Sequence, residues 1–236
     1  MLLWLVILGV AAWFAWDWWT RRHAPGAGAS AAARARQLRT PLVRLADAVG
    51  ISTQAGRLAN RYEAGATGER RLAAHLADLT RDGYTVLADR RLPRGNANVD
   101  FLVITPTGAV WLPDAKRWSA RWPLTVNAGR LMHGDHDVSG RLRGLRHETA
   151  AVSAALGVPV TPIVAMDGTP LLGPHGRPVS ELAFRGVRIV PADALPNVLR
   201  AAARIPGQRP AVELVILAEH VLPPYTHTRP RPTRNG

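Results

Sequence analysis

Apolar and polar residues alternate with two different periods along the chain, and each period predicts one kind of element. Helical spacing is found in residues 41–62 and again after Thr67, whose hydroxyl group is suited to cap a helix that ends near Asp82. Shorter runs rich in β-branched and aromatic residues follow, and they predict strands at residues 84–88, 99–105 and 109–118. The pattern therefore predicts a helix followed by a meander of three strands.

In the rest of the chain, the spacing of apolar residues again predicts both strands and helices. A Gly- and Pro-rich stretch at residues 167–178 is expected to be a surface loop. The elements expected around it are short strands at 124–127 and 130–133, a helix at 142–156, a buried strand at 158–165, a strand at 187–190 and a helix at 192–203. The order of helix, three-strand meander, helix and strand predicts a mixed α/β core.

The first nineteen residues are apolar apart from Asp17. As a helix they span roughly 28 Å, which is close to the hydrocarbon core of a bilayer, about 30 Å thick. A cleaved signal peptide is the alternative, because residues 24–29 have small side chains. However, no basic residue precedes the apolar run, and tryptophans crowd its end. We therefore expect an uncleaved, single-pass transmembrane helix over residues 1–20.

Arginines dominate the region that follows this helix, at positions 21, 22, 34, 36, 39 and 44. The positive-inside rule then places the N-terminus outside the cell membrane and the main domain in the cytoplasm. The Ala/Gly/Pro/Ser-rich residues 23–33 are expected to form a flexible tether. The expected domains are a transmembrane anchor at 1–20, a linker and juxtamembrane helix at 21–61, a main domain at 62–222 and a basic disordered tail at 223–236.

The composition is strongly basic, with 30 Lys and Arg residues against 17 Asp and Glu and a formal net charge of +13. Such a charge attracts polyanions, and composition alone does not separate nucleic acid from acidic lipid headgroups. The chain has no cysteine, which excludes disulfides, thiolate metal sites and cysteine nucleophiles. The bias toward arginine is compatible with a bacterium whose genome is rich in GC.

Lys116 is the only lysine in the chain, and it follows Asp114 by two positions in an expected strand. Residues two apart in a strand share a face, about 6.6 Å apart along the backbone. Asp100 begins the preceding strand, and a tight turn at 106–108 brings it beside Asp114. Two carboxylates and one ammonium group suit phosphodiester hydrolysis, with the carboxylates holding Mg²⁺ and the lysine stabilising charge or orienting water. The alternative is a chance lysine beside a structural aspartate.

Three blocks of sequence carry a resemblance to a known family: Gly65-Ala-Thr-Gly-Glu69, Asn96-Ala-Asn-Val-Asp-Phe-Leu-Val103 and Gly108-Ala-Val-Trp-Leu-Pro-Asp-Ala-Lys-Arg-Trp118. Together they resemble the nuclease-related domain (NERD), a branch of the PD-(D/E)xK nuclease superfamily, over about residues 62–165 and less clearly to 220. The resemblance implies a restriction-endonuclease-like fold. It also implies Asp100 and Asp114 as ligands of Mg²⁺ or Mn²⁺, Lys116 as the catalytic lysine, and Glu69 as a further acidic residue facing the site.

Two positions depart from the family pattern. Phe101 stands where the family often has a histidine, which removes a polar side chain beside Asp100. Pro113 lacks a backbone N–H in what is expected to be a central strand, so a bulge or a strand edge is expected there. Neither departure removes one of the acidic residues.

Basic and aromatic residues near these blocks are candidates for contact with nucleic acid, and DNA is the expected form. Tryptophan can stack on unpaired bases, although a tryptophan that ends a strand also suits the edge of a core. The candidates are Arg117, Trp118, Arg143 and Arg146. His147 and Glu148 lie on the same expected helix as the last two arginines, and exposure is the default expectation for both.

Other patterns support no second chemistry. Residues 132–137 contain two histidines and two aspartates, but a polar hairpin explains their spacing better than a metal site. The glycines at 168, 173 and 176 fit neither a Walker sequence nor a Rossmann fingerprint, and no serine has the glycines of a nucleophile elbow.

The sequence thus predicts a membrane-anchored, metal-dependent nuclease of the cytoplasm. One alternative is a catalytically inactive module that binds nucleic acid or acts as a scaffold at the membrane. Another is a membrane-associated interaction protein whose charge serves acidic lipid. The sequence leaves open whether the substrate is DNA or RNA, its strandedness, and the oligomeric state.

Overall fold

The computed structural model describes residues 26–40, 43, 53–95 and 97–225 of the 236-residue chain. The transmembrane helix expected at residues 1–20 and most of the expected basic tail, residues 226–236, lie outside these described residues. Within the described ranges, no helix is both long enough and apolar enough to cross a membrane.

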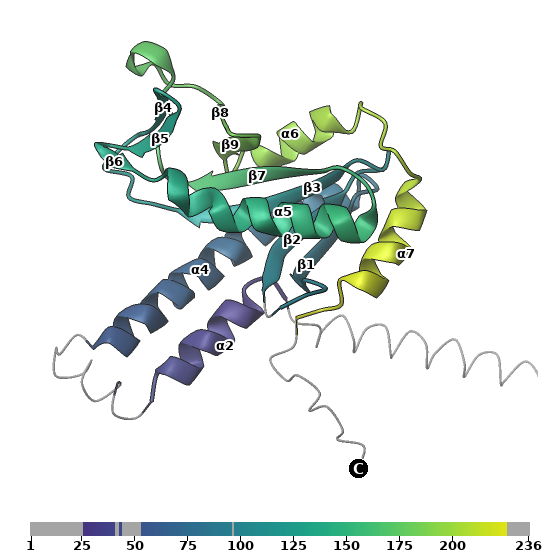
Figure 1. Ribbon diagram of the computed structural model, residues 1–236, viewed down its shortest axis with the longest axis horizontal. Coiled ribbons are helices and arrows are strands. Elements are labelled where there is room, and N and C mark those ends of the chain that lie inside the picture. Colours follow the sequence, from purple (N-terminus) through teal and green to yellow (C-terminus); the bar gives the residue numbers. More distant parts are fainter. Residues whose placement is uncertain (1–25, 41–42, 44–52, 96, 226–236) are drawn as a thin grey trace, which may run out of the picture.

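A six-stranded sheet in the order β1-β2-β3-β7-β9-β8 forms the centre of the molecule (Figure 1). Strands β1, β2 and β3 form the antiparallel meander that the sequence predicts, β3, β7 and β9 are parallel, and β8 runs antiparallel to β9. The strands are β1 (Thr85–Arg91), β2 (Asn98–Ile104), β3 (Val110–Arg117), β7 (Val160–Asp167), β8 (Leu182–Phe184) and β9 (Val187–Pro191). The expected mixed α/β fold is therefore confirmed.

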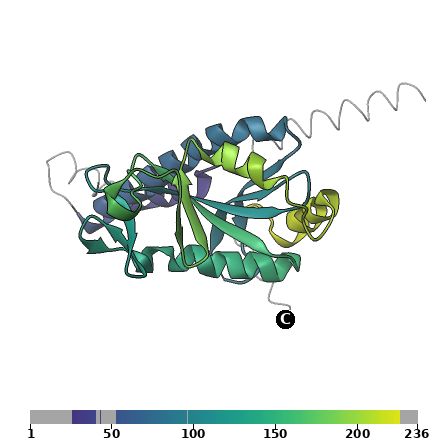
Figure 2. The same ribbon diagram turned by 90° about the horizontal axis from the view of Figure 1, so that it is seen from above.

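Helices cover both faces of this sheet, as the view from above shows (Figure 2). On one face lie α5 (Arg143–Leu156) and α7 (Ala211–Val221), and on the other lie α4 (Gln54–Leu76) and α6 (Leu195–Ala202). Strand residues alternate between the two cores, so that Leu102 packs toward α5 while its neighbour Phe101 packs toward α4. The Phe101 side chain is fully buried in the α4 core, which explains why an apolar residue is accepted there.

A second, three-stranded sheet consists of β4 (Leu124–Asn127), β5 (Arg130–His133) and β6 (His136–Asp137). The 3₁₀ helix η2 (Ser139–Leu142) connects it to the start of α5. The polar hairpin expected at residues 132–137 is confirmed, since His133 pairs with His136 across β5 and β6.

The N-terminal region differs from the prediction in two ways. Residues expected to belong to a flexible tether form α2 (Ala29–Leu38), which packs along α4 (Figure 1). The helix expected to start at Thr67 begins much earlier, because Thr53 caps α4 by accepting a hydrogen bond from the Gly56 amide at 3.0 Å. Thr67 lies inside α4, where its hydroxyl donates to the Glu63 carbonyl. Alanine-rich sequence favours helix when a neighbouring helix covers it, and the prediction of a tether was wrong for that reason.

Candidate active site

The pairing of β2 with β3 ends soon after the turn that joins them. Only Val103 with Trp111 and Ile104 with Val110 form pairs, whereas β3 pairs with β7 from Val110 to Arg117. Pro113 lies just beyond the last β2 partner of β3, where its missing N–H breaks no ladder on that side. The expected strand edge at Pro113 is therefore found on the β2 side, and the unbroken register with β7 contradicts a bulge.

Asp100 and Asp114 lie on the two strands that part at this place. Residues of one face alternate along a strand, so Asp100 shares the α5-facing side of β2 with Leu102, and Asp114 shares that side of β3 with Leu112. Lys116 is on the same face as Asp114, and its Nζ lies 2.7 Å from Asp114 Oδ1. The structure thus brings together the two carboxylates and the lysine that the sequence singled out.

Two glutamates complete the cluster, one from each layer of helices. Glu69 extends from α4 and is buried, and its Oε2 atom has no hydrogen-bond partner among the described residues. Glu148 extends from α5 and interacts electrostatically with Asp100, Asp114 and Lys116. The default expectation that Glu148 is exposed is wrong, whereas His147 is exposed.

The sequence contains a signal for Glu148 that was not used. Leu145, Val152 and Leu156 are the buried residues of α5, and Glu148 falls between the first two at helical spacing. A carboxylate that interrupts the apolar stripe of a helix is either paired or placed at a site.

Burial and mutual repulsion perturb these acids. Burial, followed by repulsion from Asp89 and Asp114, raises the pKa of Glu69 to about 7, and a backbone hydrogen bond from Gly28 opposes the rise. Burial and the Asp114 charge raise the pKa of Glu148 to about 7. Burial, with Asp114 and Glu69, holds the pKa of Asp100 well above its usual range. Four carboxylates therefore share one site in which their negative charges are poorly compensated.

Lys116 is the cation inside this cluster. Burial acts against its charged form, but Asp114, Asp100 and Glu148 outweigh burial, and the pKa of Lys116 is raised above its ordinary value. The lysine therefore stays an ammonium at neutral pH. It can stabilise negative charge or donate a hydrogen bond, and it is not a base in this arrangement.

A separate hydrogen-bond network surrounds Asp89, which lies on β1. Its carboxylate is fully buried and accepts hydrogen bonds from the Ser30 amide at 3.0 Å and from Asn98 Nδ2 at 2.8 Å. Gly28 sits beside these groups with a positive φ of 79°, and a Cβ atom there would lie 2.6 Å from the Ala66 carbonyl oxygen. The start of α2 is thus fitted against the acids of the sheet, which the sequence did not indicate.

The donor atoms suit a hard divalent cation. All four candidate ligands are carboxylates, the type of ligand that Mg²⁺ and Mn²⁺ prefer, and the buried Glu69 Oε2 has no other partner within the described chain. In the observed arrangement, no three His, Cys, Asp or Glu side chains of the described residues are close enough to hold one ion. The Lys116 ammonium is paired with Asp114 instead. The residue chemistry fits a metal, and a shared coordination sphere requires side-chain movement.

Arg117 and Trp118, two of the residues expected to contact nucleic acid, directly follow Lys116 in the chain. Arg117 ends β3 and is exposed, with its Nε 3.8 Å from Asp167 Oδ2. Trp118 is half-buried, since the His133 ring lies 5.6 Å away and the Arg141 guanidinium covers it at 5.0 Å. One face of this tryptophan is therefore occupied, and Arg141 joins the basic residues that the sequence indicated.

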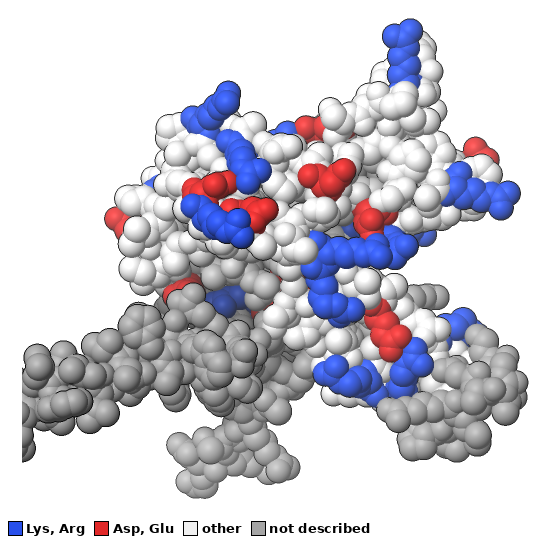
Figure 3. All heavy atoms as spheres, turned by 180° about the vertical axis from the view of Figure 1, so that it is seen from behind, with Lys and Arg blue, Asp and Glu red and all other residues white. Residues whose placement is uncertain are grey.

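Arg143 and Arg146 are exposed in the first turn of α5. Within the described part of the chain, neither arginine has an acidic partner within 4.0 Å. The opposite face differs, because basic and acidic side chains lie next to one another there (Figure 3). On that side α4 contributes the Arg71–Asp167 pair at 2.8 Å, and α6 contributes the Arg200–Asp82 pair at 2.9 Å. Arg143 and Arg146 thus add uncompensated positive charge at the start of α5.

Comparison with known proteins identifies this region of the chain. No match was found among curated proteins, and none among solved structures. Residues 64–166 match the family model of the nuclease-related domain, and this segment contains Glu69, Asp100, Asp114, Lys116 and Glu148. The resemblance seen in the three sequence blocks is therefore confirmed, and the chain contains a nuclease-related (NERD) domain.

Proposed function

We propose that this protein is a metal-dependent nuclease that hydrolyses phosphodiester bonds of nucleic acid, with DNA as the expected substrate. The observation that carries the proposal is the convergence of Glu69, Asp100, Asp114 and Glu148 around Lys116, at the place where β2 and β3 part. A nuclease-related domain over the same residues supports it.

In this mechanism Asp100 and Asp114 would hold Mg²⁺ or Mn²⁺. Glu69 and Glu148 interact electrostatically with these two aspartates, so their negative charges would also favour a bound cation. A bound cation of this kind polarises the phosphate and lowers the pKa of a bound water. Lys116, which stays protonated, donates a hydrogen bond to the negative charge that develops on the phosphate. Glu148, whose pKa is about 7, can exchange a proton with water or with the leaving group at neutral pH.

Substrate would approach over the basic residues at this end of the sheet. Arg117 follows Lys116 on β3, and Arg141, Arg143 and Arg146 lie just before or in the first turn of α5, the helix that carries Glu148. All four are exposed, and exposed arginines attract phosphate backbones. Trp118 contributes an aromatic edge beneath Arg141.

A catalytically inactive module that binds nucleic acid is the second candidate. One observation favours it, since no three acidic side chains of the described residues are arranged to hold a metal without movement. In that case Lys116 would permanently neutralise Asp114.

We also propose that residues 1–20 hold this domain at the cytoplasmic face of the cell membrane, with the N-terminus outside. The apolar run and the arginines that follow it support this arrangement. Protease digestion of intact and opened cells tests it, because only opened cells should lose the C-terminal domain.

The test of the nuclease uses the purified full chain in mild detergent with plasmid DNA, single-stranded DNA and RNA, each with Mg²⁺, Mn²⁺ or EDTA. Asp114→Ala and Lys116→Ala are expected to lower the cleavage rate by about 100-fold or more, since each removes charge from the reacting phosphate. Cleavage that survives both substitutions contradicts the assignment. Binding with a steep salt dependence and no cleavage by the unaltered chain selects the inactive module.

A further inference from the structure

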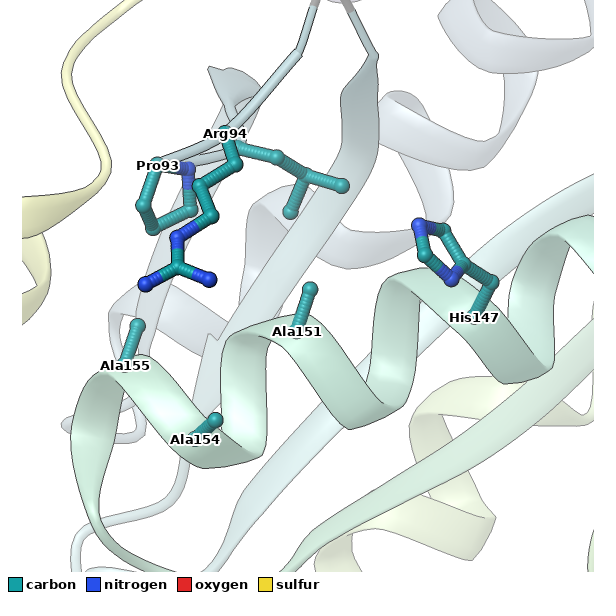
Figure 4. Close-up of a pocket in the computed structure, with 7 residues that line it drawn as sticks. Pro93, Arg94, His147, Ala151, Ala154 and Ala155 are labelled. Atoms are coloured by element: carbon teal, nitrogen blue, oxygen red, sulfur yellow. The ribbon is translucent and has the colours of Figure 1, made fainter.

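A pocket of about 400 Å³ lies between the loop that follows β1 and helix α5 (Figure 4). Its volume is within the range of small-molecule binding sites. The residues that line it include Pro93, Arg94, His147, Ala151, Ala154 and Ala155.

The chemistry of the pocket suits one unpaired nucleotide. Three alanines form a flat apolar floor along α5, and small side chains at these positions leave the space open. Arg94 and His147 stand on two sides of this floor (Figure 4). Guanidinium and imidazole groups are planar, so they can stack on a base, and both donate hydrogen bonds to phosphate. Within the described residues, Arg94 has no acidic partner that would hold its charge.

Both walls of the pocket belong to segments that also carry residues of the carboxylate cluster. His147 immediately precedes Glu148 on α5. His147 lines the pocket, whereas Glu148 interacts with Asp114 and Lys116 of the cluster. The opposite wall belongs to the loop that leads into β2, on which Asp100 is the third residue. A strand whose phosphate lies at the cluster would therefore have a neighbouring nucleotide at the pocket.

We propose that this pocket binds a nucleotide next to the scissile phosphate, and that the protein acts on single-stranded or locally unpaired nucleic acid. The proposal rests on the nuclease function given above. A base inside a duplex exposes only its edges, whereas this pocket has an apolar floor and planar side groups for a base face. Stacking of this kind contributes about 1–3 kcal/mol per base and tolerates any sequence.

Filling the pocket tests the proposal. Ala151→Leu adds bulk to the floor, and Ala154→Leu does the same at a more exposed position in case the first variant folds poorly. Leucine and alanine have similar helix propensities. Ala150→Leu is the matched control, because Ala150 is exposed on α5 outside the pocket.

The measurement is fluorescence anisotropy of the full chain in EDTA, where nothing is cut, with a labelled single-stranded oligonucleotide and with the same sequence as a duplex. We expect the unaltered chain to prefer the single strand. The filled variants are expected to weaken single-strand binding about tenfold and to leave duplex binding unchanged, and Ala150→Leu should match the unaltered chain. Arg94→Ala should weaken single-strand binding in the same way.

A preference for duplex, or filled variants that bind single strands as well as the control does, overturns the proposal. A free mononucleotide that competes in the unaltered chain but not in the filled variants shows that the pocket takes the nucleotide itself. Failure to compete overturns the pocket assignment. Because binding is measured without metal, a chain that binds in this way but never cuts contradicts the nuclease function and leaves the pocket in place.

Discussion

Two aspartates at opposite positions of β1 and β2 lie in different environments. The pairs on either side, Ala88 with Phe101 and Arg90 with Val99, place Asp89 opposite Asp100. Asp89 is fully buried, but donors from Ser30 and Asn98 satisfy its carboxylate. Asp100 receives no hydrogen bond from the described residues, and three other carboxylates act on it.

The difference shows how this fold separates structural from chemical acids. A buried carboxylate that accepts hydrogen bonds can remain charged at little cost, and it then fixes the elements that donate to it. A carboxylate surrounded by like charges and few donors is costly, and a cation would relieve that cost. The Asp89 network therefore holds α2 against the sheet. In the carboxylate cluster, by contrast, Lys116 neutralises only part of the negative charge.

Matched substitutions of the two aspartates give the largest effect. Asp100→Asn is expected to lower cleavage by about 100-fold or more with little loss of stability, because it removes a repelled charge. Asp89→Asn turns an acceptor into a donor that faces other donors, so it should lower the free energy of unfolding by about 3 kcal/mol. Cleavage assays and denaturant unfolding measure the two effects. Equal losses of stability in both variants would remove the distinction.

The pH dependence of stability tests the cost of the carboxylate cluster. The folded-state pKa of Glu148 is about 7 and lies above its unfolded value. The folded chain then binds more protons between the two values. The associated stability is complete below the unfolded pKa and is lost as the pH rises through about 7.

Glu148→Gln stays neutral at all pH values, so it should be more stable than the unaltered chain at pH 8, by at most about 3 kcal/mol. At pH 4 the two chains should unfold alike. Thermal unfolding at both pH values measures the difference. A variant that is less stable at pH 8 would show that the Glu148 charge is compensated after all.

Added metal offers a third way to distinguish Asp100 from Asp89. A ligand that binds only the folded chain stabilises it by about 2.7 kcal/mol at a concentration 100 times its dissociation constant. Mn²⁺ should therefore raise the melting temperature of the unaltered chain. It should do the same for Ser30→Ala, which keeps the carboxylate cluster, but not for Asp100→Asn. An equal rise in all three chains would mean that Mn²⁺ binds elsewhere.

The sequence predicted the elements whose pattern is local. Strands β1 to β3 follow from short apolar runs and from the turn at Gly108, where the φ of 84° and the nearby Arg209 carbonyl require a glycine. Helix α7 was missed because its exposed side mixes the apolar Val212 and Ile216 with the polar Glu213 and Glu219. Apolar residues among the exposed positions hide the helical period in the sequence.

The candidate site was predictable only where its residues share a strand or a turn. Asp114 and Lys116 follow from two-residue spacing, and Asp100 follows from the hairpin. Glu148 comes from another layer, and its approach depends on how α5 packs on the sheet. The contact of α2 with Asp89 depends on a hydrogen bond across 59 residues, for which the sequence has no local signal.

The smallest expected effects distinguish the two donors that hold Asp89. Asn98→Ala removes the amide that donates to Asp89 Oδ1, and it should lower the free energy of unfolding by about 1.5–3 kcal/mol, because the acceptor is charged. Ser30→Ala keeps the backbone donor to Oδ2 and removes only the hydroxyl that accepts from Asn98, so its cost should be about 0.5–1 kcal/mol. Denaturant unfolding measures both. If Ser30→Ala costs as much as Asn98→Ala, the side-chain hydroxyl and not the backbone amide would be the group that joins α2 to the sheet.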